Sequence, residues 1–215
     1  MARVEIKGTI VANNDKWIYN WFGMDAVCPK DVQKAIADAH GEHLQVEINS
    51  GGGDVFAGNE IYYMLHEYQG GTTADIVGFA GSAATIICCG ANRVRAVPGA
   101  LYMIHNVSGS AQGDYRAMLH SSEKLQIANQ SISNIYKMKT GMDDAELLAL
   151  MNQESWMDAK TAKENGFVDE IIGDNGRLYN ACFANILPEE VLEKMRNTVL
   201  HQGENNPDFF MLKNQ

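Results

Sequence analysis

The sequence predicts an α/β protein with a parallel-rich β-sheet. Short apolar runs rich in β-branched residues alternate with segments whose apolar residues recur every three or four positions. Such an alternation of strands and helices favours parallel strands covered by helices. The chain has 215 residues, 46% of them hydrophobic and 20% charged, which is enough for one well-buried domain and short for two.

Strands and helices alternate through the first half of the chain. Residues 1–25 are expected to form one or two strands with a loop at 12–16. Pro29 begins a predicted helix, whose apolar positions keep helical spacing up to Gly41. A strand at 44–48, a glycine turn at 49–53 and a helix with Ile61 and Leu65 on one face follow. The next expected elements are a strand at 73–77, a helix at 83–91 and two short strands at 93–97 and 101–104.

A long helix dominates the second half. It follows a loop of Ser, Gly and Gln at 108–113 and is predicted from about Asp114 to Lys139, with Gly141 as its cap. At some 25 residues it would reach roughly 38 Å, so we expect part of it to serve an interface. Its apolar stripe consists of Leu125, Ala128, Ile132 and Ile135. Short helices at 143–152 and 158–165 and a strand at 168–172 are expected after it.

Residues 174–215 differ from the rest of the chain. They contain a short predicted helix at 188–197 and a polar stretch at 201–208 before the apolar sequence Phe209-Phe210-Met211-Leu212. We therefore predict a main domain over residues 1–173 and a partly disordered C-terminal extension over residues 174–215.

Composition argues against several functional classes. The net charge is −10 without a basic stripe, which disfavours nucleic-acid binding. The longest apolar run, 76–91, is interrupted and too short to span a membrane, and the first residues carry charges where a signal peptide would need an apolar core. A cytoplasmic location is expected. The four cysteines fit no zinc or haem pattern, and no metal or organic cofactor is indicated.

Ser82 is the most informative residue. It lies in Gly-Phe-Ala-Gly-Ser-Ala-Ala-Thr at 78–85, between a predicted strand and a predicted helix. A sharp turn there would expose the hydroxyl and aim the first helical N–H groups at the atom it attacks. Ala84 replaces the last glycine of the G-x-S-x-G motif, and small residues around a serine more often reflect tight packing between a helix and a strand.

Two further segments strengthen the catalytic hypothesis. His105 follows a predicted strand, where a parallel sheet exposes functional groups, and could carry the serine proton to the leaving amine. The glycine turn at 49–53 could supply an oxyanion donor and a peptide-docking edge, although a tight turn also accounts for it. The acid that orients the imidazole is expected to be Glu154 or Asp158. Asp158 already serves as the expected N-cap of the next helix, so Glu154 is preferred.

Four motifs in this order and spacing resemble the Clp protease proteolytic-subunit family. They are Ile48-Asn49-Ser50-Gly51-Gly52-Gly53, Gly81-Ser82-Ala83-Ala84, Met103-Ile104-His105-Asn106 and the segment from Trp156 to Asp169. The chain resembles this family over about residues 1–173, and most of all its phage branch, the ClpP-like head maturation (prohead) proteases. The resemblance implies a crotonase-like α/β fold of repeated β-β-α units with a long protruding helix, and a serine peptidase with a Ser-His-acid triad.

The resemblance also implies roles for individual residues. Ser82 matches the nucleophile, His105 matches the base, and the backbone N–H groups of Gly53 and Ala83 match the oxyanion donors. The usual aspartate aligns with Glu154, whose side chain is one methylene longer.

The implied assembly is a homo-oligomer of stacked rings. The long helix would meet its partner across the ring–ring contact, and loop 108–113 would hold a substrate peptide by backbone pairing. Gly51 departs from the proline that is usual in the chaperone-dependent branch. The implied partners are protein or peptide substrates, with either capsid and scaffold proteins or an AAA+ unfoldase.

Three classes of function remain open. The favoured hypothesis is a serine endopeptidase acting through an acyl-enzyme, as a phage head maturation protease. The alternative within this class is the proteolytic subunit of an ATP-dependent Clp protease working with an unfoldase. A crotonase-type acyl-CoA enzyme would share the fold and the glycine turn but needs no Ser–His pair. A non-catalytic ring scaffold would follow if Glu154 disrupted the triad geometry.

Overall fold

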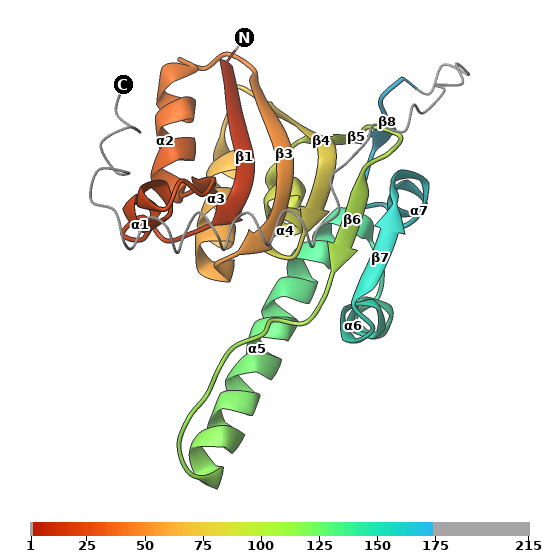
Figure 1. Cartoon of the computed structure of the whole chain (residues 1–215). Helices are drawn as coiled ribbons and strands as arrows, with labels where there is room; N and C mark the ends of the chain where they lie inside the picture. The colour runs from red at the N-terminus through yellow and green to blue at the C-terminus, as the bar shows by residue number, and fades with distance from the viewer. Residues whose placement is uncertain (1, 174–215) are drawn as a thin grey trace, which may run out of the picture. The chain divides into compact units, whose positions relative to one another are not determined.

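The computed structural model describes residues 2–173, which form a mixed α/β fold around one β-sheet (Figure 1). The described strands build an eight-stranded sheet in the order β2-β1-β3-β4-β5-β8, in which β6 pairs with β4, and β7 with β6. Among these pairings only that of β6 with β7 is antiparallel. The predicted α/β class with a parallel-rich sheet is therefore confirmed.

The strands are β1 (Ala2–Ile10), β2 (Ala26–Val27), β3 (Leu44–Gly53), β4 (Thr72–Gly81), β5 (Arg93–Ala96), β6 (Leu101–Ile104), β7 (Ser155–Asp158) and β8 (Glu170–Ile171). The helices are α1 (Lys16–Trp21), α2 (Pro29–Asp38), α3 (Val55–Glu67), α4 (Ala83–Gly90), α5 (Tyr115–Thr140), α6 (Asp144–Asn152) and α7 (Ala159–Glu164). The C-terminal extension predicted at 174–215, with its helix at 188–197, lies outside the described residues.

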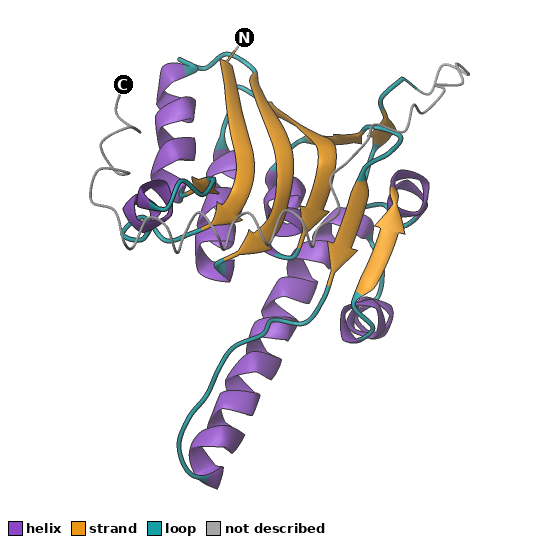
Figure 2. Ribbon diagram, viewed as in Figure 1, coloured by secondary structure: helices purple, strands orange, loops and turns teal. Residues whose placement is uncertain are grey.

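Helices α3 and α4 lie side by side against the sheet (Figure 2). The strands bury branched side chains such as Ile48 and Ile76, and the helices add Ile61, Leu65 and Ile87 to the same core. Burying a side chain of this size stabilises the fold by about 1.5–3 kcal/mol. This core keeps β3 and β4 rigid, and these two strands carry the glycine segment and the serine turn.

The glycine segment differs from its prediction. It was expected to be a turn after the strand, but β3 continues through it to Gly53. The parallel register with β1 shifts and then resumes, so that Gly52 pairs with Thr9 and Gly53 with Ile10. Glycine allows this irregular strand because Gly52 and Gly53 adopt φ values of 100° and 147°.

Two short elements, α1 and β7, were not predicted from the sequence. Helix α1 has only six residues, too few for a helical spacing of apolar positions to be recognised in the sequence. Strand β7 has four residues and forms by antiparallel pairing with β6, a partner more than fifty positions earlier in the chain. Both elements depend on tertiary context rather than on a local pattern.

Helix α5 extends away from the sheet, and the loop that follows β6 runs beside it (Figure 1). Asp114 caps its N-terminus by accepting hydrogen bonds from the N–H groups of Arg116 and Ala117. Gly141 ends it in the left-handed conformation, with φ 77°. The predicted bounds of 114–139 are thus confirmed to within one residue.

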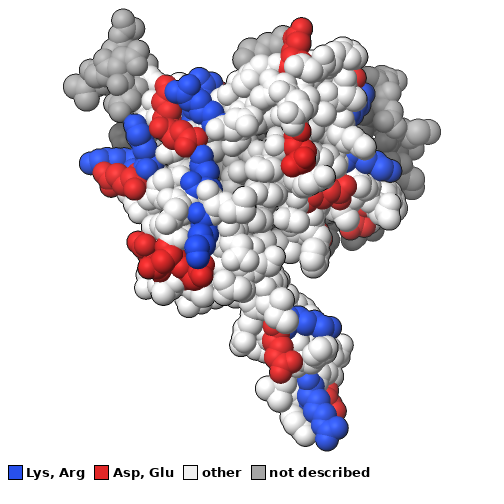
Figure 3. Space-filling model, turned by 180° about the vertical axis from the view of Figure 1, so that it is seen from behind, with Lys and Arg blue, Asp and Glu red and all other residues white. Residues whose placement is uncertain are grey.

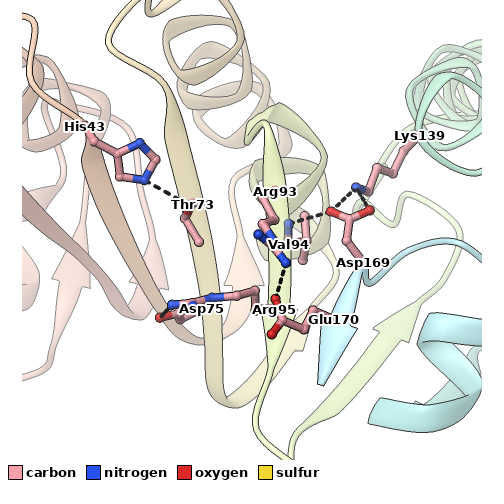
Figure 4. A network of polar contacts seen from close by, with 9 residues as sticks. All are labelled: His43, Thr73, Asp75, Arg93, Val94, Arg95, Lys139, Asp169 and Glu170. Atoms are coloured by element: carbon pink, nitrogen blue, oxygen red, sulfur yellow. Dashed lines mark hydrogen bonds and ion pairs between the residues drawn. The ribbon is translucent and has the colours of Figure 1, made fainter. Parts of the chain in front are cut away.

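A polar network fixes the C-terminal end of α5 to the edge of the sheet (Figure 4). Lys139 forms an ion pair with Asp169 at 2.8 Å, and Asp169 also accepts a 2.6 Å hydrogen bond from the N–H of Val94 in β5. Beside it, Arg95 and Asp75 form two hydrogen bonds of 2.7 Å. Asp169 therefore joins α5, β5 and the start of β8, and the lysine also complements the helix dipole.

Charges of both signs are interspersed on the face seen in Figure 3, including α5 at the lower right. Exposed or half-buried pairs such as Lys7–Glu47 and Lys16–Asp31 have separations of 2.9 and 2.6 Å. Surface pairs of this kind contribute little to stability. Of the helices in the described region, none is both long and apolar enough to cross a membrane.

Candidate active site

Ser82 and His105 meet in a hydrogen bond. Ser82 lies between the end of β4 and the start of α4, and His105 directly follows β6. The parallel pairing of β4 with β6 aligns Gly81 with Met103, and the Ser82 N–H donates to the Met103 carbonyl at 2.9 Å. His105 Nε2 consequently lies 2.7 Å from Ser82 Oγ. The sheet register thus joins two residues that are far apart in sequence.

The backbone of Ser82 is strained. Its φ of 53° and ψ of −124° lie in a region that L-residues with side chains rarely adopt. Such strain persists only where the surrounding structure enforces it, and it is typical of a nucleophile on a sharp strand-to-helix turn. The predicted turn geometry of Ser82 is present in the structure.

Glycine is required where β3 touches this turn. A Cβ at Gly52 would lie 2.7 Å from Ser82 Cβ and 2.9 Å from the Ala83 nitrogen. A Cβ at Gly53 would lie 2.1 Å from the carbonyl oxygen of Ile10. Gly51 is different, because the nearest atom to an added Cβ is a Phe79 ring carbon at 3.8 Å. Gly52 therefore permits the close approach of β3 to the serine turn, and Gly53 permits its close approach to β1.

The two predicted oxyanion residues border the same cleft as the Ser–His pair. Ala83 is the first residue of α4, and the first N–H groups of a helix have no partner within it. Gly53 is the last residue of β3 and lines the cleft with Ser82. The Ala83 N–H is thus free of a helical partner, and both residues lie in the region where an oxyanion next to Ser82 would form.

The cleft has a volume of about 370 Å³. Ser82 and His105 lie in it together with apolar side chains from three helices. Those side chains are Val55, Phe56, Ile86, Leu125, Ala128, Ile132 and Tyr136. Val107 and Ser108 of the loop before α5 complete one wall, and Lys124 contributes a cation. The cleft suits an extended chain with an apolar side chain near the serine.

The third member of the predicted triad is not hydrogen-bonded to the other two. The Glu154 carboxylate accepts a 3.3 Å hydrogen bond from the indole N–H of Trp156, whose ring stacks on Phe79 at 5.2 Å. In the part of the chain that the structure describes, no carboxylate forms a hydrogen bond or ion pair with His105. The structure therefore brings Ser82 and His105 together and leaves the role of Glu154 a prediction.

The strand register nevertheless distinguishes the two acid candidates. The β6–β7 ladder pairs Leu101 with Asp158 and ends with Ile104 opposite Ser155. His105 directly follows this last pair on one strand and Glu154 directly precedes it on the other, so both residues flank the same end of the ladder, where Glu154 lies in a turn with φ 51°. Asp158 pairs with Leu101, four strand positions before His105, which at about 3.4 Å per residue is a separation of roughly 14 Å along the strand.

Asp158 also performs the structural role expected of it. Its carboxylate accepts a 2.7 Å hydrogen bond from the Thr161 N–H and caps α7. This backbone hydrogen bond holds the pKa of Asp158 below its usual value. The cap and the distance from His105 both argue against Asp158 as the orienting acid.

A buried polar link behind the serine was missed in the sequence. The Tyr136 hydroxyl donates to Thr85 Oγ1 at 2.6 Å, and the Thr85 hydroxyl donates to the Ser82 carbonyl at 2.6 Å. Burial raises the pKa of Tyr136 well above its usual range, so the phenol stays protonated. The signal was available: Thr85 is polar within an apolar helix, and Tyr136 continues the apolar stripe of α5 through Ile132.

The arrangement as a whole is that of a serine hydrolase. A serine on a strained strand-to-helix turn donates or accepts a hydrogen bond with an imidazole, next to helix N–H groups that can receive negative charge. Within residues 2–173, no group of three or more His, Cys, Asp or Glu side chains is arranged as a metal site.

Comparison with known proteins gives the family. The family model described as Clp protease matches residues 33–175, well over half of the chain, and the chain belongs to the Clp protease family, a family of serine peptidases. The predicted resemblance is thereby confirmed at the level of the family.

Curated relatives carry the name ATP-dependent Clp protease proteolytic subunit. The relative from Chlorella vulgaris is 29% identical over 140 residues, 64% of this chain and 70% of the relative. That from Oltmannsiellopsis viridis is 27% identical over 137 residues, 63% and 70% of the two chains. That from Bacteroides thetaiotaomicron is 31% identical over 134 residues, 61% of each chain.

Proposed function

We propose that this protein is an endopeptidase in which Ser82 is the nucleophile and His105 the general base. The observation that carries this proposal is the 2.7 Å hydrogen bond between Ser82 Oγ and His105 Nε2. His105 would accept the hydroxyl proton as Ser82 attacks the peptide carbonyl, and then return it to the leaving amine. His105 would then accept a proton from water as it attacks the acyl-enzyme carbonyl, and pass that proton to the departing Ser82 oxygen.

Gly53 and Ala83 would stabilise the tetrahedral intermediate through their N–H groups. Both residues border the cleft next to Ser82, and the N-terminus of α4 contributes the positive end of its dipole. Glu154 would orient the imidazole and stabilise its charged form. The β6–β7 ladder supports this role, since its last pair, Ile104 with Ser155, stands directly beside His105 and Glu154.

The loop before α5 would bind the substrate backbone. Among the described residues, the backbone of 108–113 forms no hydrogen bond with the rest of the chain, so its N–H and C=O groups can pair with an extended peptide. The apolar wall of α5 would receive a side chain of that peptide, since Leu125 lies beside Gly109 of the loop and Ile132 lines the same cleft as the serine. Peptides with an apolar residue before the scissile bond are the expected substrates.

We favour a ring-shaped homo-oligomer that receives unfolded protein from an AAA+ partner. The curated relatives are named proteolytic subunits of ATP-dependent Clp proteases, which supports this role. A cytoplasmic setting agrees with the free thiols of Cys28, Cys88 and Cys89, because disulfides are rare in a reducing compartment. ATP-dependent degradation of casein by this chain together with a Clp unfoldase tests the role.

Phage head maturation is the second candidate role. Two departures from the usual family pattern favour it: Glu154 replaces the usual aspartate, and Gly51 replaces the usual proline. In this role the substrates would be capsid and scaffold proteins, and no unfoldase would be needed. Cleavage of assembled capsid precursor without ATP would support it, whereas strong stimulation of casein degradation by an unfoldase would exclude it.

The peptidase proposal is tested with a fluorophosphonate probe and mass spectrometry of the labelled peptide. We expect labelling of Ser82 that disappears in Ser82→Ala and falls strongly in His105→Ala. His120→Ala is the matched control, because His120 is an exposed histidine of α5 outside the cleft. Equal labelling of wild type and His105→Ala, or none in the assembled wild type, would refute the assignment.

A further inference from the structure

The segment that carries Glu154 is joined to β6 on both sides of the expected His105–Glu154 pair. On one side, the last backbone pair of the β6–β7 ladder is Ile104 with Ser155. On the other side, Asn106 Nδ2 donates a 2.8 Å hydrogen bond to Asn152 Oδ1. The base follows the ladder and precedes Asn106, and the acid lies between Asn152 and Ser155. The two links therefore enclose the pair.

Glu154 itself has little to hold it in place. Its φ of 51° lies in the left-handed region, which disfavours a residue with a side chain. Its N–H donates to the Met151 carbonyl at 3.2 Å, and its carboxylate contacts Trp156 within its own strand segment. Beyond the ladder, in the described part of the chain, the Asn106–Asn152 bond is the side-chain hydrogen bond that connects this segment to β6.

The Asn106 amide occupies its position at an energetic cost. Its Oδ1 atom is buried and has no hydrogen-bond partner among the described residues, and a buried unsatisfied acceptor is destabilising. Rotating the amide by 180° would not help, because it would place Oδ1 against the Asn152 oxygen. An apolar side chain would avoid the unsatisfied atom, so the benefit of asparagine here lies in the bond that it donates.

We propose that Asn106 and Asn152 are positioning residues that hold Glu154 opposite His105. This inference rests on the proposed function, in which the Glu154 carboxylate orients and stabilises the His105 imidazolium. The bond fixes the distance between the residue after the base and the segment before the acid. Without it, the end of α6 can shift relative to β6, and the carboxylate loses its alignment with the imidazole.

The test compares Asn152→Leu with Asn152→Asp. The leucine is similar in size and removes the acceptor, whereas the aspartate retains an acceptor oxygen in the same place. We expect Asn152→Leu to lower kcat about tenfold to a hundredfold at unchanged KM, as small misplacements of catalytic groups do. The pH–kcat/KM profile should change in the same direction as in Glu154→Gln, because both changes take the carboxylate away from the imidazole. Asn152→Asp should restore most of the rate.

Two further variants separate a loss of positioning from a general loss of folding or assembly. Asn106→Asp is nearly isosteric and cannot donate, so it should reproduce the loss seen in Asn152→Leu even if the leucine variant fails to assemble. Asn165→Leu is the control, because the Asn165 amide bonds Met157 from β7 at 3.3 Å without contacting the candidate site. We expect Asn165→Leu to keep the wild-type pH profile.

A cycle with Glu154→Gln separates the inference from the proposed function. In the Glu154→Gln background, Asn152→Leu should cause no further shift of the pH profile, because no carboxylate remains to be positioned. If Glu154→Gln alone keeps the wild-type rate and profile, the proposed acid and this inference both fail. If Glu154→Gln is impaired while Asn152→Leu and Asn106→Asp behave as wild type, the proposed function stands and the positioning role is refuted.

Discussion

Gly52→Ala is expected to reduce catalysis far more than its size suggests. The φ of Gly52 is 100°, and an L-residue held at positive φ costs about 1–2 kcal/mol. The added Cβ would lie 2.7 Å from Ser82 Cβ, so β3 and the serine turn must separate by about 0.7 Å to reach the 3.4 Å of ordinary contact. The same Cβ would press on the Ala83 nitrogen, whose N–H is a proposed oxyanion donor.

The expected consequence is a fall in kcat of about 10²-fold, since the loss or displacement of one oxyanion donor costs roughly that much. The assay is steady-state hydrolysis of a fluorogenic peptide, with the free energy of unfolding measured in urea for the same variants. Gly51→Ala is the matched control in the same strand, because its Cβ would meet nothing closer than 3.8 Å and its φ is not positive. We expect Gly51→Ala to retain the wild-type rate.

The comparison can refute the argument in two ways. A Gly52→Ala enzyme with the wild-type kcat would show that the contact between β3 and the serine turn does not hold the nucleophile in place. Equal losses in Gly51→Ala and Gly52→Ala would show that the strand as a whole is sensitive, rather than the contact with Ser82 and Ala83.

Three other predictions concern the surroundings of the site. In urea unfolding, Thr85→Val should cost about 1–3 kcal/mol because it leaves the buried Tyr136 hydroxyl without an acceptor, whereas Tyr136→Phe should cost only about 1 kcal/mol; the reverse order would contradict the polar link. Asp158→Ala should retain the wild-type kcat at neutral pH. The lowered pKa of Asp158 stabilises the fold above the ordinary pKa of 3.8, and this stabilisation is lost as pH falls through the lowered pKa. Thermal scans should therefore show that the variant loses less stability than wild type on acidification. Lys124 lines the cleft without an ion-pair partner in the described region, so the ratio of kcat/KM for matched Glu and Gln peptides should fall in Lys124→Gln and stay unchanged in Lys163→Gln.

Local sequence signals located most of the fold and two residues of the candidate site. The apolar stripe of α5 and its end signals, Asp114 and Gly141, gave its bounds to within one residue because they depend on the helix alone. Ser82 and His105 were identifiable because each lies at the end of a recognisable strand. That the two side chains meet could be inferred only with the additional knowledge that β4 and β6 are parallel neighbours in the sheet.

The remainder depends on contacts between distant segments. Strand β7 forms only against β6, and its register is what separates Glu154 from Asp158 as the acid candidate. The Asn106–Asn152 bond joins side chains 46 positions apart and has no local signature. The pattern of small residues predicted a sharp turn at Ser82, but the contact of Gly52 with that turn joins two strands and is visible only in the structure.

Helix α5 can act as a lever arm with its fulcrum beside the nucleophile. From Tyr136 to its free end it is about 30 Å long, so a tilt of about 5° at the fulcrum displaces that end by roughly 3 Å at 1.5 Å of rise per residue. The same lever operates in reverse, since a force applied at the far end is delivered through Tyr136 and Thr85 to the carbonyl of Ser82. Any contact made by the tip of α5 is therefore mechanically connected to the backbone of the serine turn.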